Sequence, residues 1–293
     1  MNNIPLVSII CLSMNHEKYI GKSFRSAINQ TYSNIEILYV DNHSSDASFE
    51  IADAIFRNSG YAYKGFKQEK SFGISQNINF LITQAIGKYI TLLSADDWWE
   101  LTNLEEKINF YEKHPQYGLL HGSGYLYFYD TGKKEVEPII SSKSGWLLPD
   151  VLKRNFINTI GVIIKKETVN NVGLFDETSS LEDWDMWIRI AEKYEIGFFN
   201  KPLVYYGRNT GTNVSENKVY MNEGYEYIFK KYAHYKEIEE AKKYYKMVEI
   251  YDAAAKAPDF GSLLQLLKKY QFTFLHFKQV VKCLFGIMGF KIQ

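Results

Sequence analysis

The chain has 293 residues, 34 of them basic and 34 acidic, so its formal net charge is zero. This balance excludes a general nucleic-acid binder, which carries a basic surface for phosphates. A chain of this length can bury a sizeable core and form one large domain, or one domain with an appendage.

The first third of the chain alternates apolar runs with stretches of helical spacing. The apolar runs predict strands at residues 6–12, 35–40, 61–66 and 89–93. The stretches between them predict helices at 17–30, 49–56 and 74–85. Four successive alternations of this kind are typical of a parallel, doubly wound α/β sheet.

Polar side chains follow the predicted strands at the points where the strands end. They are Ser13, Asp41, Asn42 and the adjacent pair Asp96 and Asp97. Because ligands of open parallel sheets bind at the carboxyl ends of strands, we expect these side chains at one binding edge. Two adjacent carboxylates are costly to bury, and a divalent cation such as Mg²⁺ or Mn²⁺ removes that cost. Taken alone, two adjacent aspartates more often form a solvated turn that caps a helix. The strand and helix pattern around them favours the cation site instead.

The middle of the chain continues the main domain. We expect a helix at 101–113, a hairpin turn at 130–133, a strand at 160–164, a turn at 172–177 and an amphipathic helix at 182–194. The pattern shows neither an internal repeat nor a low-complexity linker. We therefore predict one continuous domain over residues 1–215.

Residues 216–293 differ in character and predict a helical extension. From 260 to 293 there are five lysines and no acidic residue among many apolar ones. Such a basic amphipathic segment suits an anionic membrane surface, and it suits equally a pair of helices packed on the main domain. No run reaches the roughly 20 apolar residues that cross a bilayer.

The expected location is the cytoplasm, with at most a peripheral membrane contact through residues 260–293. The two cysteines, Cys11 and Cys283, do not suggest a structural disulfide, so a reducing compartment is the simpler assumption. The N-terminal residues also lack the basic segment and apolar core of a secretory signal.

Six motifs occur in order along residues 5–215. They are Val7–Ile10 with Asn15, Val40–Asn42 with Ser44–Asp46, Gly73 with Ser75 and Asn77, Gly87–Ile90 running to Ser94–Asp97, Val172–Glu177, and Glu182–Arg189. Each motif is weak alone, but together and in this order the chain resembles glycosyltransferase family 2. The resemblance implies the GT-A fold, a Rossmann-like and mostly parallel sheet, and inverting transfer from a nucleotide-diphosphate sugar.

The resemblance also implies a role for each matching residue. The nucleotide sugar, UDP-linked by preference, would contact Leu12, Ser13, Met14, Asp41, Asn42, Gly73, Asn77 and Asp96. Asp97 would hold the divalent metal, Asp183 would be the catalytic base, and Trp184 and Trp187 would stack on the acceptor. Without the motif, Asp183 would be an ordinary helix cap and the tryptophans would be core residues.

Several positions depart from the family pattern. Residues 12–14 read Leu-Ser-Met where members often have Pro-Thr-Tyr, so a base-stacking Tyr is missing. Asn42 stands in place of a second Asp, and its amide oxygen can still accept a hydrogen bond from a uracil or thymine ring N–H. Gln76 replaces an Arg, and Thr210 lies near the usual place of a metal-binding His. Metal ligation would therefore depend mainly on Asp97 and the phosphates.

These observations favour a metal-dependent, inverting glycosyltransferase of hexosyltransferase type. Its acceptor would be a saccharide or a lipid-linked glycan in surface polysaccharide synthesis. The alternative is a non-catalytic sugar-nucleotide-binding assembly protein of the same fold, motivated by the missing Arg and His. A nucleotidyltransferase would share the sheet and the acids, but it needs a Gly-rich basic phosphate loop that residues 13–16 do not provide.

Overall fold

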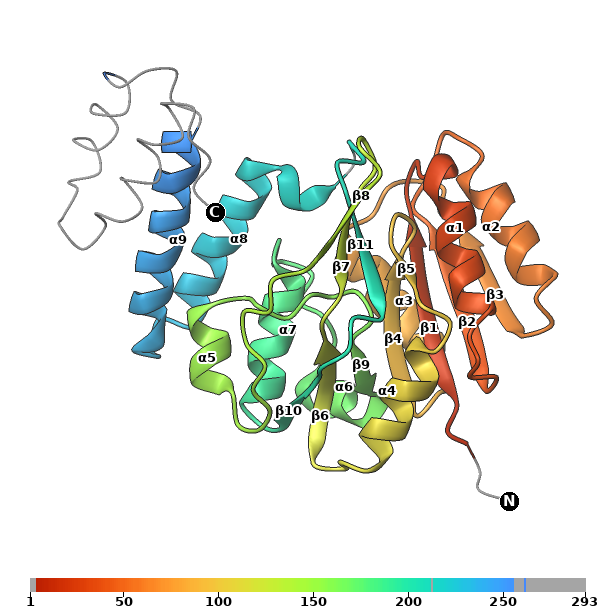
Figure 1. The fold of residues 1–293 in the computed structure, drawn as a ribbon, viewed down its shortest axis with the longest axis horizontal. Coiled ribbons are helices and arrows are strands. Elements are labelled where there is room, and N and C mark those ends of the chain that lie inside the picture. Colours follow the sequence, from red (N-terminus) through yellow and green to blue (C-terminus); the bar gives the residue numbers. More distant parts are fainter. Residues whose placement is uncertain (1–3, 212, 256–260, 262–293) are drawn as a thin grey trace. The chain divides into compact units, whose positions relative to one another are not determined.

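The computed structural model describes residues 4–211, 213–255 and 261 (Figure 1). Its strands are β1 (Val7–Ser13), β2 (Ile35–Asp41), β3 (Ala62–Lys67), β4 (Tyr89–Ser94), β5 (Trp98–Trp99), β6 (Tyr117–Gly122), β7 (Tyr125–Phe128), β8 (Lys133–Val136), β9 (Ile163–Lys165), β10 (Glu195–Phe199) and β11 (Val204–Arg208). Its helices are α1 (Glu17–Ile28), α2 (Ser48–Arg57), α3 (Ile74–Gln84), α4 (Asn103–Glu112), α5 (Leu148–Lys153), α6 (Lys166–Val172), α7 (Glu182–Ala191), the 3₁₀ helix η1 (Val214–Glu216), α8 (Lys218–Lys231) and α9 (Glu237–Ala255).

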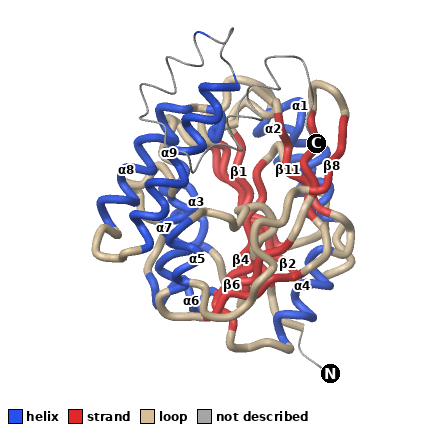
Figure 2. The backbone as a smooth tube through the Cα atoms, turned by 60° about the vertical axis from the view of Figure 1, so that its left-hand side comes forward, coloured by secondary structure: helices blue, strands red, loops and turns tan. Residues whose placement is uncertain are grey.

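The main sheet of the described residues has seven strands in the order β10-β6-β9-β4-β1-β2-β3. β1 pairs in parallel with β2 and β4, and so do β2 with β3 and β6 with β10. β9 is antiparallel to both of its neighbours. Helices α1, α2 and α4 lie on one side of the sheet, and α3, α6 and α7 lie on the other (Figure 2). The predicted α/β class with a mostly parallel sheet is confirmed.

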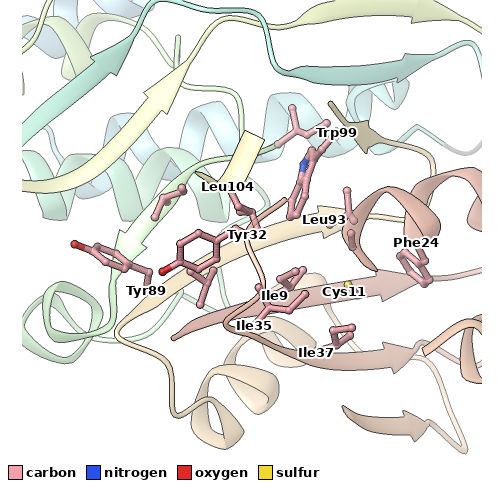
Figure 3. Packing of buried hydrophobic residues seen from close by; sticks show 14 of the residues in the cluster. Ile9, Cys11, Phe24, Tyr32, Ile35, Ile37, Tyr89, Leu93, Trp99 and Leu104 are labelled. Carbon is pink, nitrogen blue, oxygen red and sulfur yellow. The ribbon is translucent and has the colours of Figure 1, made fainter. Parts of the chain in front are cut away.

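The central strands form because their apolar runs are covered on both faces. All seven residues of β2 are buried, and β1 is buried at six of its seven positions. Figure 3 shows Phe24 of α1 and Leu104 of α4 in the same core as residues of β1, β2 and β4. This packing fixes the strands, and the strands in turn fix where their carboxyl ends present polar groups.

A smaller sheet of the described residues has the order β5-β11-β7-β8. β7 and β8 form the predicted hairpin, and Gly132 in its turn has φ 68°. The sequence pattern did not predict β11, whose Val-Tyr-Tyr-Gly-Arg segment has no apolar run. β11 pairs antiparallel with β5, which directly follows the Asp96–Asp97 pair. The second sheet therefore lies next to the turn that follows β4, where the Asp96–Asp97 pair is found.

Contacts group the chain into two units. They are residues 1–151 with 155–231, and residues 152–154 with 232–293. The first unit includes α8, because Phe229 lies edge-on against Trp184 and Lys231 forms an ion pair with Asp176. The division thus falls after Lys231, whereas the sequence pattern placed it after residue 215.

The segment 260–293 was predicted to contact a membrane or to pack on the main domain. Except for Gly261, it lies outside the described residues, and Cys283 lies outside them as well. Within the part of the chain that is described, no helix combines the length and the apolar character needed to span a membrane.

Candidate active site

The carboxyl ends of β1, β2 and β4 lie side by side. Ser13 is the register partner of Asp41, and Leu12 is the register partner of Ser94. The backbone N–H of Ala95 then donates to the Leu12 carbonyl at 3.1 Å. The predicted polar residues of these three strands therefore meet at one edge, as the parallel pairing requires.

Asp41 is fully buried and accepts several hydrogen bonds from its own chain. The Ser13 hydroxyl donates to its Oδ1 at 3.0 Å, and the Ser44 hydroxyl donates to the same oxygen at 2.6 Å. The Ser44 backbone N–H donates to its Oδ2 at 2.8 Å. The two bonds from Ser44 close a turn over residues 41–44, and this turn fixes the loop after β2. The Tyr39 hydroxyl donates to Oδ1 as well, at 3.4 Å. Asp41 therefore shapes the site, and a direct nucleotide contact would have to share these oxygens with four protein donors.

Asn42 connects the end of β2 to the loop before α3. Its Oδ1 accepts from the Phe72 N–H at 2.8 Å, and its Nδ2 donates to the Phe72 carbonyl at 3.0 Å. The next residue, Gly73, donates its N–H to Gln76 at 2.9 Å. The amide oxygen that we expected to face a nucleobase is thus bonded to the loop backbone. We assign Asn42 to positioning Phe72 and Gly73.

Asn77, on the first turns of α3, is buried in the wall of this edge. Its Oδ1 accepts from Gln68 at 3.1 Å, and the Gln68 N–H donates to the Asp41 carbonyl at 3.0 Å. By contrast, Met14 is 41% exposed and Leu12 is half-buried. Among the residues predicted to contact the nucleotide, Asp41 and Asn77 are therefore buried in the protein, whereas Met14 and Leu12 have surface that a ligand could contact.

Asp96 and Asp97 occupy a buried turn between β4 and β5. Asp97 Oδ1 accepts the N–H of Gly207 in β11 at 2.8 Å. Asp96 Oδ2 accepts from the Asn213 amide at 3.2 Å, and Asn213 also donates to the Gly207 carbonyl at 3.0 Å. A Cβ at position 207 would lie 2.3 Å from the Asp96 carbonyl oxygen, so only glycine allows this approach. Thr210, expected near this place, donates its N–H to Asn213 at 3.1 Å.

The electrostatics of this pair fit a cation. Burial and the neighbouring Asp96 charge raise the pKa of the Asp97 carboxyl well above its ordinary value. Burial also raises the pKa of Asp96, and the nearby His16 opposes that rise. The described residues contain no cluster of three or more His, Cys, Asp or Glu side chains suited to a metal. Two adjacent buried carboxyl groups are nevertheless the type of oxygen ligand that a hard divalent cation prefers.

Asp183 lies in the first turn of α7 and is half-buried. The Asn155 amide lies 3.2 Å from both of its oxygens, and the Thr159 hydroxyl donates to Oδ2 at 3.1 Å. Burial raises the pKa of this carboxyl, while these donors oppose the rise. A carboxylate held in one orientation with a raised pKa is suited to accept a proton.

Glu137 links the surroundings of Asp97 to those of Asp183. Its charge contributes to the raised pKa of the Asp97 carboxyl. The Asn158 amide donates to Glu137 Oε1 at 3.2 Å, and the next residue, Thr159, donates to Asp183. Glu137 therefore acts electrostatically on Asp97 and is hydrogen-bonded to the segment that holds Asp183.

The sequence model of the family described as Glycosyl transferase family 2 matches residues 8–172, more than half of the chain. The chain belongs to glycosyltransferase family 2. The match ends before Asp183, so the base assignment depends on the later motif and on the contacts just described.

Relatives agree with this membership. An uncharacterized glycosyltransferase of Rickettsia bellii is 31% identical over 207 residues, which are 68% of this chain and 29% of that protein. A Bacillus subtilis protein named "Putative glycosyltransferase EpsE" is 25% identical over 70% of this chain and 73% of its own length. The chain thus spans less than a third of the Rickettsia protein and most of EpsE.

Solved structures of other glycosyltransferases share the fold. S. aureus TarS 1–349 in complex with UDP-GlcNAc has a TM-score of 0.64 at 16% identity, covering 96% of this chain and 80% of that one. The mannosyltransferase PcManGT of Pyrobaculum calidifontis, in complex with GDP-Man and Mn²⁺, has a TM-score of 0.62 at 14% identity, covering 98% and 88%. The predicted GT-A fold of this family member is confirmed.

The two tryptophans of the last family motif need a correction. Trp184 and Trp187 are both 0% exposed. The Trp184 indole N–H donates to the Val151 carbonyl at 2.7 Å, and that of Trp187 donates to the Ile157 carbonyl at 3.2 Å. Neither ring offers a face to a ligand, so the prediction that they stack on an acceptor is wrong. They pack α7 into the core and thereby fix the turn that holds Asp183.

Sequence reasoning missed several residues that build this site. They are Gly207 and Asn213 beside the Asp pair, Glu137, and Asn155 and Thr159 beside Asp183. Their contacts join segments far apart in the chain, up to 117 residues for the Asn213–Asp96 hydrogen bond. None belongs to a motif quoted above, so no local pattern pointed to them.

Glu182, the neighbour of the candidate base, makes stability depend on pH. Burial and the Asp183 charge raise the pKa of Glu182 from 4.5 to about 8. Between these values the unfolded chain has released a proton that the folded chain still holds, so this group reduces stability as pH rises toward 8. The uncharged Glu182→Gln variant should therefore gain stability over the wild type progressively through this range. Urea unfolding at several pH values checks this, and a pH-independent difference would contradict it.

Proposed function

We propose that this protein transfers a sugar from a nucleotide-diphosphate sugar to a hydroxyl of a saccharide or lipid-linked acceptor, with inversion at the anomeric carbon. The observation that carries the proposal is the place of Glu137 between the two carboxylates. Its charge contributes to the raised pKa of the Asp97 carboxyl, and its Oε1 accepts from Asn158, whose neighbour Thr159 donates to Asp183. Glu137 thus relates a candidate cation site to a candidate base in a member of a glycosyltransferase family.

The donor would bind at the edge formed by β1, β2 and β4. Leu12, Met14 and Gly73 are the more exposed residues there, and Asp96 follows β4, whose last residue Ser94 is the register partner of Leu12. We assign contacts with base and ribose to these four. Four buried residues would hold the surrounding loops, namely Ser13, Asp41, Asn42 and Asn77. A UDP-linked sugar is the first donor to test, and the UDP-GlcNAc complex of TarS supports that choice.

Asp97, with Asp96 beside it, would hold Mg²⁺ or Mn²⁺ together with oxygens of the donor diphosphate. The fit rests on the buried, mutually repelling carboxyl groups, and the Mn²⁺ complex of PcManGT supports it. When bound, the cation supplies positive charge that stabilises the leaving diphosphate.

Asp183 would accept the proton of the acceptor hydroxyl. The hydroxyl oxygen then forms a bond to the anomeric carbon on the face opposite the diphosphate. The bond from that carbon to the diphosphate oxygen breaks, and its electron pair leaves with the nucleoside diphosphate. Asn155 and Thr159 hold Asp183 in the orientation that this step requires.

We place this activity in the synthesis of a cell-envelope polysaccharide, on the cytoplasmic side of the membrane. A peripheral membrane contact through residues 260–293 would bring the enzyme to a lipid-linked acceptor, because that segment is basic and apolar.

A thermal-shift screen of nucleotide sugars with Mn²⁺ tests the donor site. A ligand that binds only the folded state raises the melting temperature by mass action, so the true donor should give the largest shift. The shift should disappear with a chelator. A screen in which no nucleotide sugar raises the melting temperature would contradict the proposal. Tight nucleotide binding without any release of nucleoside diphosphate would favour the non-catalytic alternative.

A further inference from the structure

One face of the smaller sheet carries a row of aromatic residues. Trp98 of β5 pairs in register with Tyr205 of β11, and Tyr205 pairs in register with Tyr125 of β7. Tyr127 lies two residues further along β7. Register partners project to the same side of a sheet, and so do residues two apart in one strand. The four rings therefore share one side, and together they form the aromatic face of this sheet.

Two lysines lie over this row of rings. Lys22 of α1 places its Nζ 3.2 Å from the ring centroid of Trp98. Lys134 of β8 places its Nζ 3.6 Å from the ring centroid of Tyr125, and it donates to the Tyr205 hydroxyl at 2.7 Å. An ammonium group over a ring is attracted by the negative face of the ring. Both lysines are exposed, so the aromatic face holds two positive charges at the surface of the protein.

The rings of the aromatic face are not open to a sugar. The ring centroids of Trp98 and Tyr205 are 4.7 Å apart with an interplanar angle of 12°, and Tyr125 stacks on Tyr205 at 4.9 Å. Trp98 is 7% exposed, whereas Tyr125 and Tyr205 are half-buried. The stacked rings cover one another's faces, so ring edges and ammonium groups meet the solvent. A saccharide ring therefore has no free ring face to stack on in this row.

The exposed side of α1 extends the positive charge. Lys18, Lys22 and Arg25 are all exposed, and their spacing of four and three residues places them along one side of the helix. Among the residues that the structure describes, none of these three forms an ion pair with a carboxylate. Glu100, a carboxylate beside the aromatic face, is half-buried and accepts from the Tyr205 hydroxyl at 2.6 Å. Positive charge thus prevails at this surface.

We propose that α1 and the aromatic face form one docking surface for a membrane of anionic phospholipids. Tyrosine and tryptophan join an apolar ring to a polar tip, and they are enriched where proteins meet lipid headgroups. Basic side chains are attracted to anionic headgroups. The basic groups are spread over about 10 Å of α1 and onto β8, which suits a surface of many anions rather than a single one. The charged residues of the docking surface are Lys18, Lys22, Arg25 and Lys134.

The docking surface borders the candidate donor site. Tyr129 lies edge-on to Tyr127 with ring centroids 5.2 Å apart, and its hydroxyl donates to the Asp96 carbonyl at 3.1 Å. A protein docked here would have its donor site near the headgroups, where a lipid-linked acceptor is held. This contact goes beyond the proposed function, and it is separate from the one assigned to residues 260–293.

Vesicle sedimentation of the full chain tests the proposal. The probes are vesicles of pure phosphatidylcholine and vesicles of which a third is phosphatidylglycerol. The wild type should bind the anionic vesicles more tightly, and added salt should weaken that binding. The double variant Lys22→Gln with Lys134→Gln should bind them about 25-fold more weakly, because each basic residue near an anionic surface contributes about fivefold. Its melting temperature and its nucleotide affinity should stay close to wild type.

A matched double variant removes two lysines elsewhere. Lys64 of β3 and Lys113, which follows α4, are both exposed and lie outside the docking surface. Lys64→Gln with Lys113→Gln lowers the net charge by the same amount, so it should keep wild-type binding to anionic vesicles.

Val136→Asp provides a second test at the rim of the aromatic face. Val136 is the register partner of Tyr125 and is 61% exposed, so the change should not disturb the fold. A carboxylate here faces the headgroups and should weaken binding to anionic vesicles about fivefold. The control is Ile86→Asp, because Ile86 is 72% exposed in the connection between α3 and β4. It should bind like the wild type.

Equal binding of anionic vesicles by the two double lysine variants would overturn the proposal, and this is the result if residues 260–293 make the membrane contact alone. Failure of the wild type to bind anionic vesicles would overturn it as well. If the wild type bound soluble polygalacturonate through Lys22 and Lys134 but bound no vesicle, the surface would belong to an anionic polymer. Sugar transfer enters none of these measurements, so their failure leaves the proposed function standing.

Discussion

Asp183→Asn is expected to lower the rate of sugar transfer by about 100-fold to 10,000-fold, the range for loss of a general base. The amide cannot accept the proton of the acceptor hydroxyl at neutral pH. Its oxygen can still accept the hydrogen bond from Thr159 that Asp183 Oδ2 accepts at 3.1 Å. Donor affinity and melting temperature should therefore stay close to wild type. The measurement is a steady-state assay of transfer beside donor calorimetry.

A half-buried aspartate outside the candidate site provides the control for this variant. Asp53 pairs with the exposed Arg57 at 2.6 Å on α2, and Asp53→Asn should keep wild-type transfer. If Asp183→Asn transferred sugar as fast as Asp53→Asn, Asp183 would not be the base. A large loss of donor affinity would also contradict the assignment, because the base is assigned to the acceptor.

Asp97→Asn is expected to abolish the metal-dependent part of donor binding and to lower transfer by about 100-fold or more, as for loss of a main electrostatic stabiliser. Without metal, the same variant should melt at a higher temperature than the wild type. The change removes one of two adjacent buried carboxylates, while its amide oxygen can still accept the Gly207 N–H that lies 2.8 Å from Asp97. Like charges in a buried turn repel, so losing one stabilises the fold.

Melting curves with and without Mn²⁺ measure both effects at once. The wild type should gain stability from Mn²⁺ with a nucleotide sugar, and Asp97→Asn should gain little. A variant that keeps the full gain would show that Asp97 does not hold the cation. A variant that melts lower than the wild type without metal would show that the carboxylate serves mainly as a structural acceptor for Gly207.

Three of the predicted strands of the main sheet share one property. β1, β2 and β4 are mostly apolar runs because both of their faces are covered, and such runs can be recognised from the sequence alone. β11 is half-buried at three of its five residues and offered no such run. Its contribution to the site is the backbone N–H of Gly207, which meets Asp97 across 110 residues of chain. A backbone donor brought in by long-range pairing has no signature in the local sequence.

The site residues divide in a similar way. Asp41 and the Asp96–Asp97 pair were predicted correctly as residues of the sheet edge, because parallel strands end together. Asn42 was expected to read a nucleobase, but its amide is bonded to Phe72, and side-chain direction cannot be read from its position. Trp184 and Trp187 share one face of α7, and helical spacing alone does not tell whether that face is inside. Their N–H groups bond to carbonyls of other segments, which decides the question.

The central claim is that Asp97 and Asp183 serve one reaction, the first through a cation and the second through a proton. Release of nucleoside diphosphate in the presence of donor and acceptor, with Mn²⁺ or with a chelator, tests this most directly in the wild type, Asp97→Asn and Asp183→Asn. Fast release is expected only for the wild type with Mn²⁺. Wild-type release rates in both variants would contradict it.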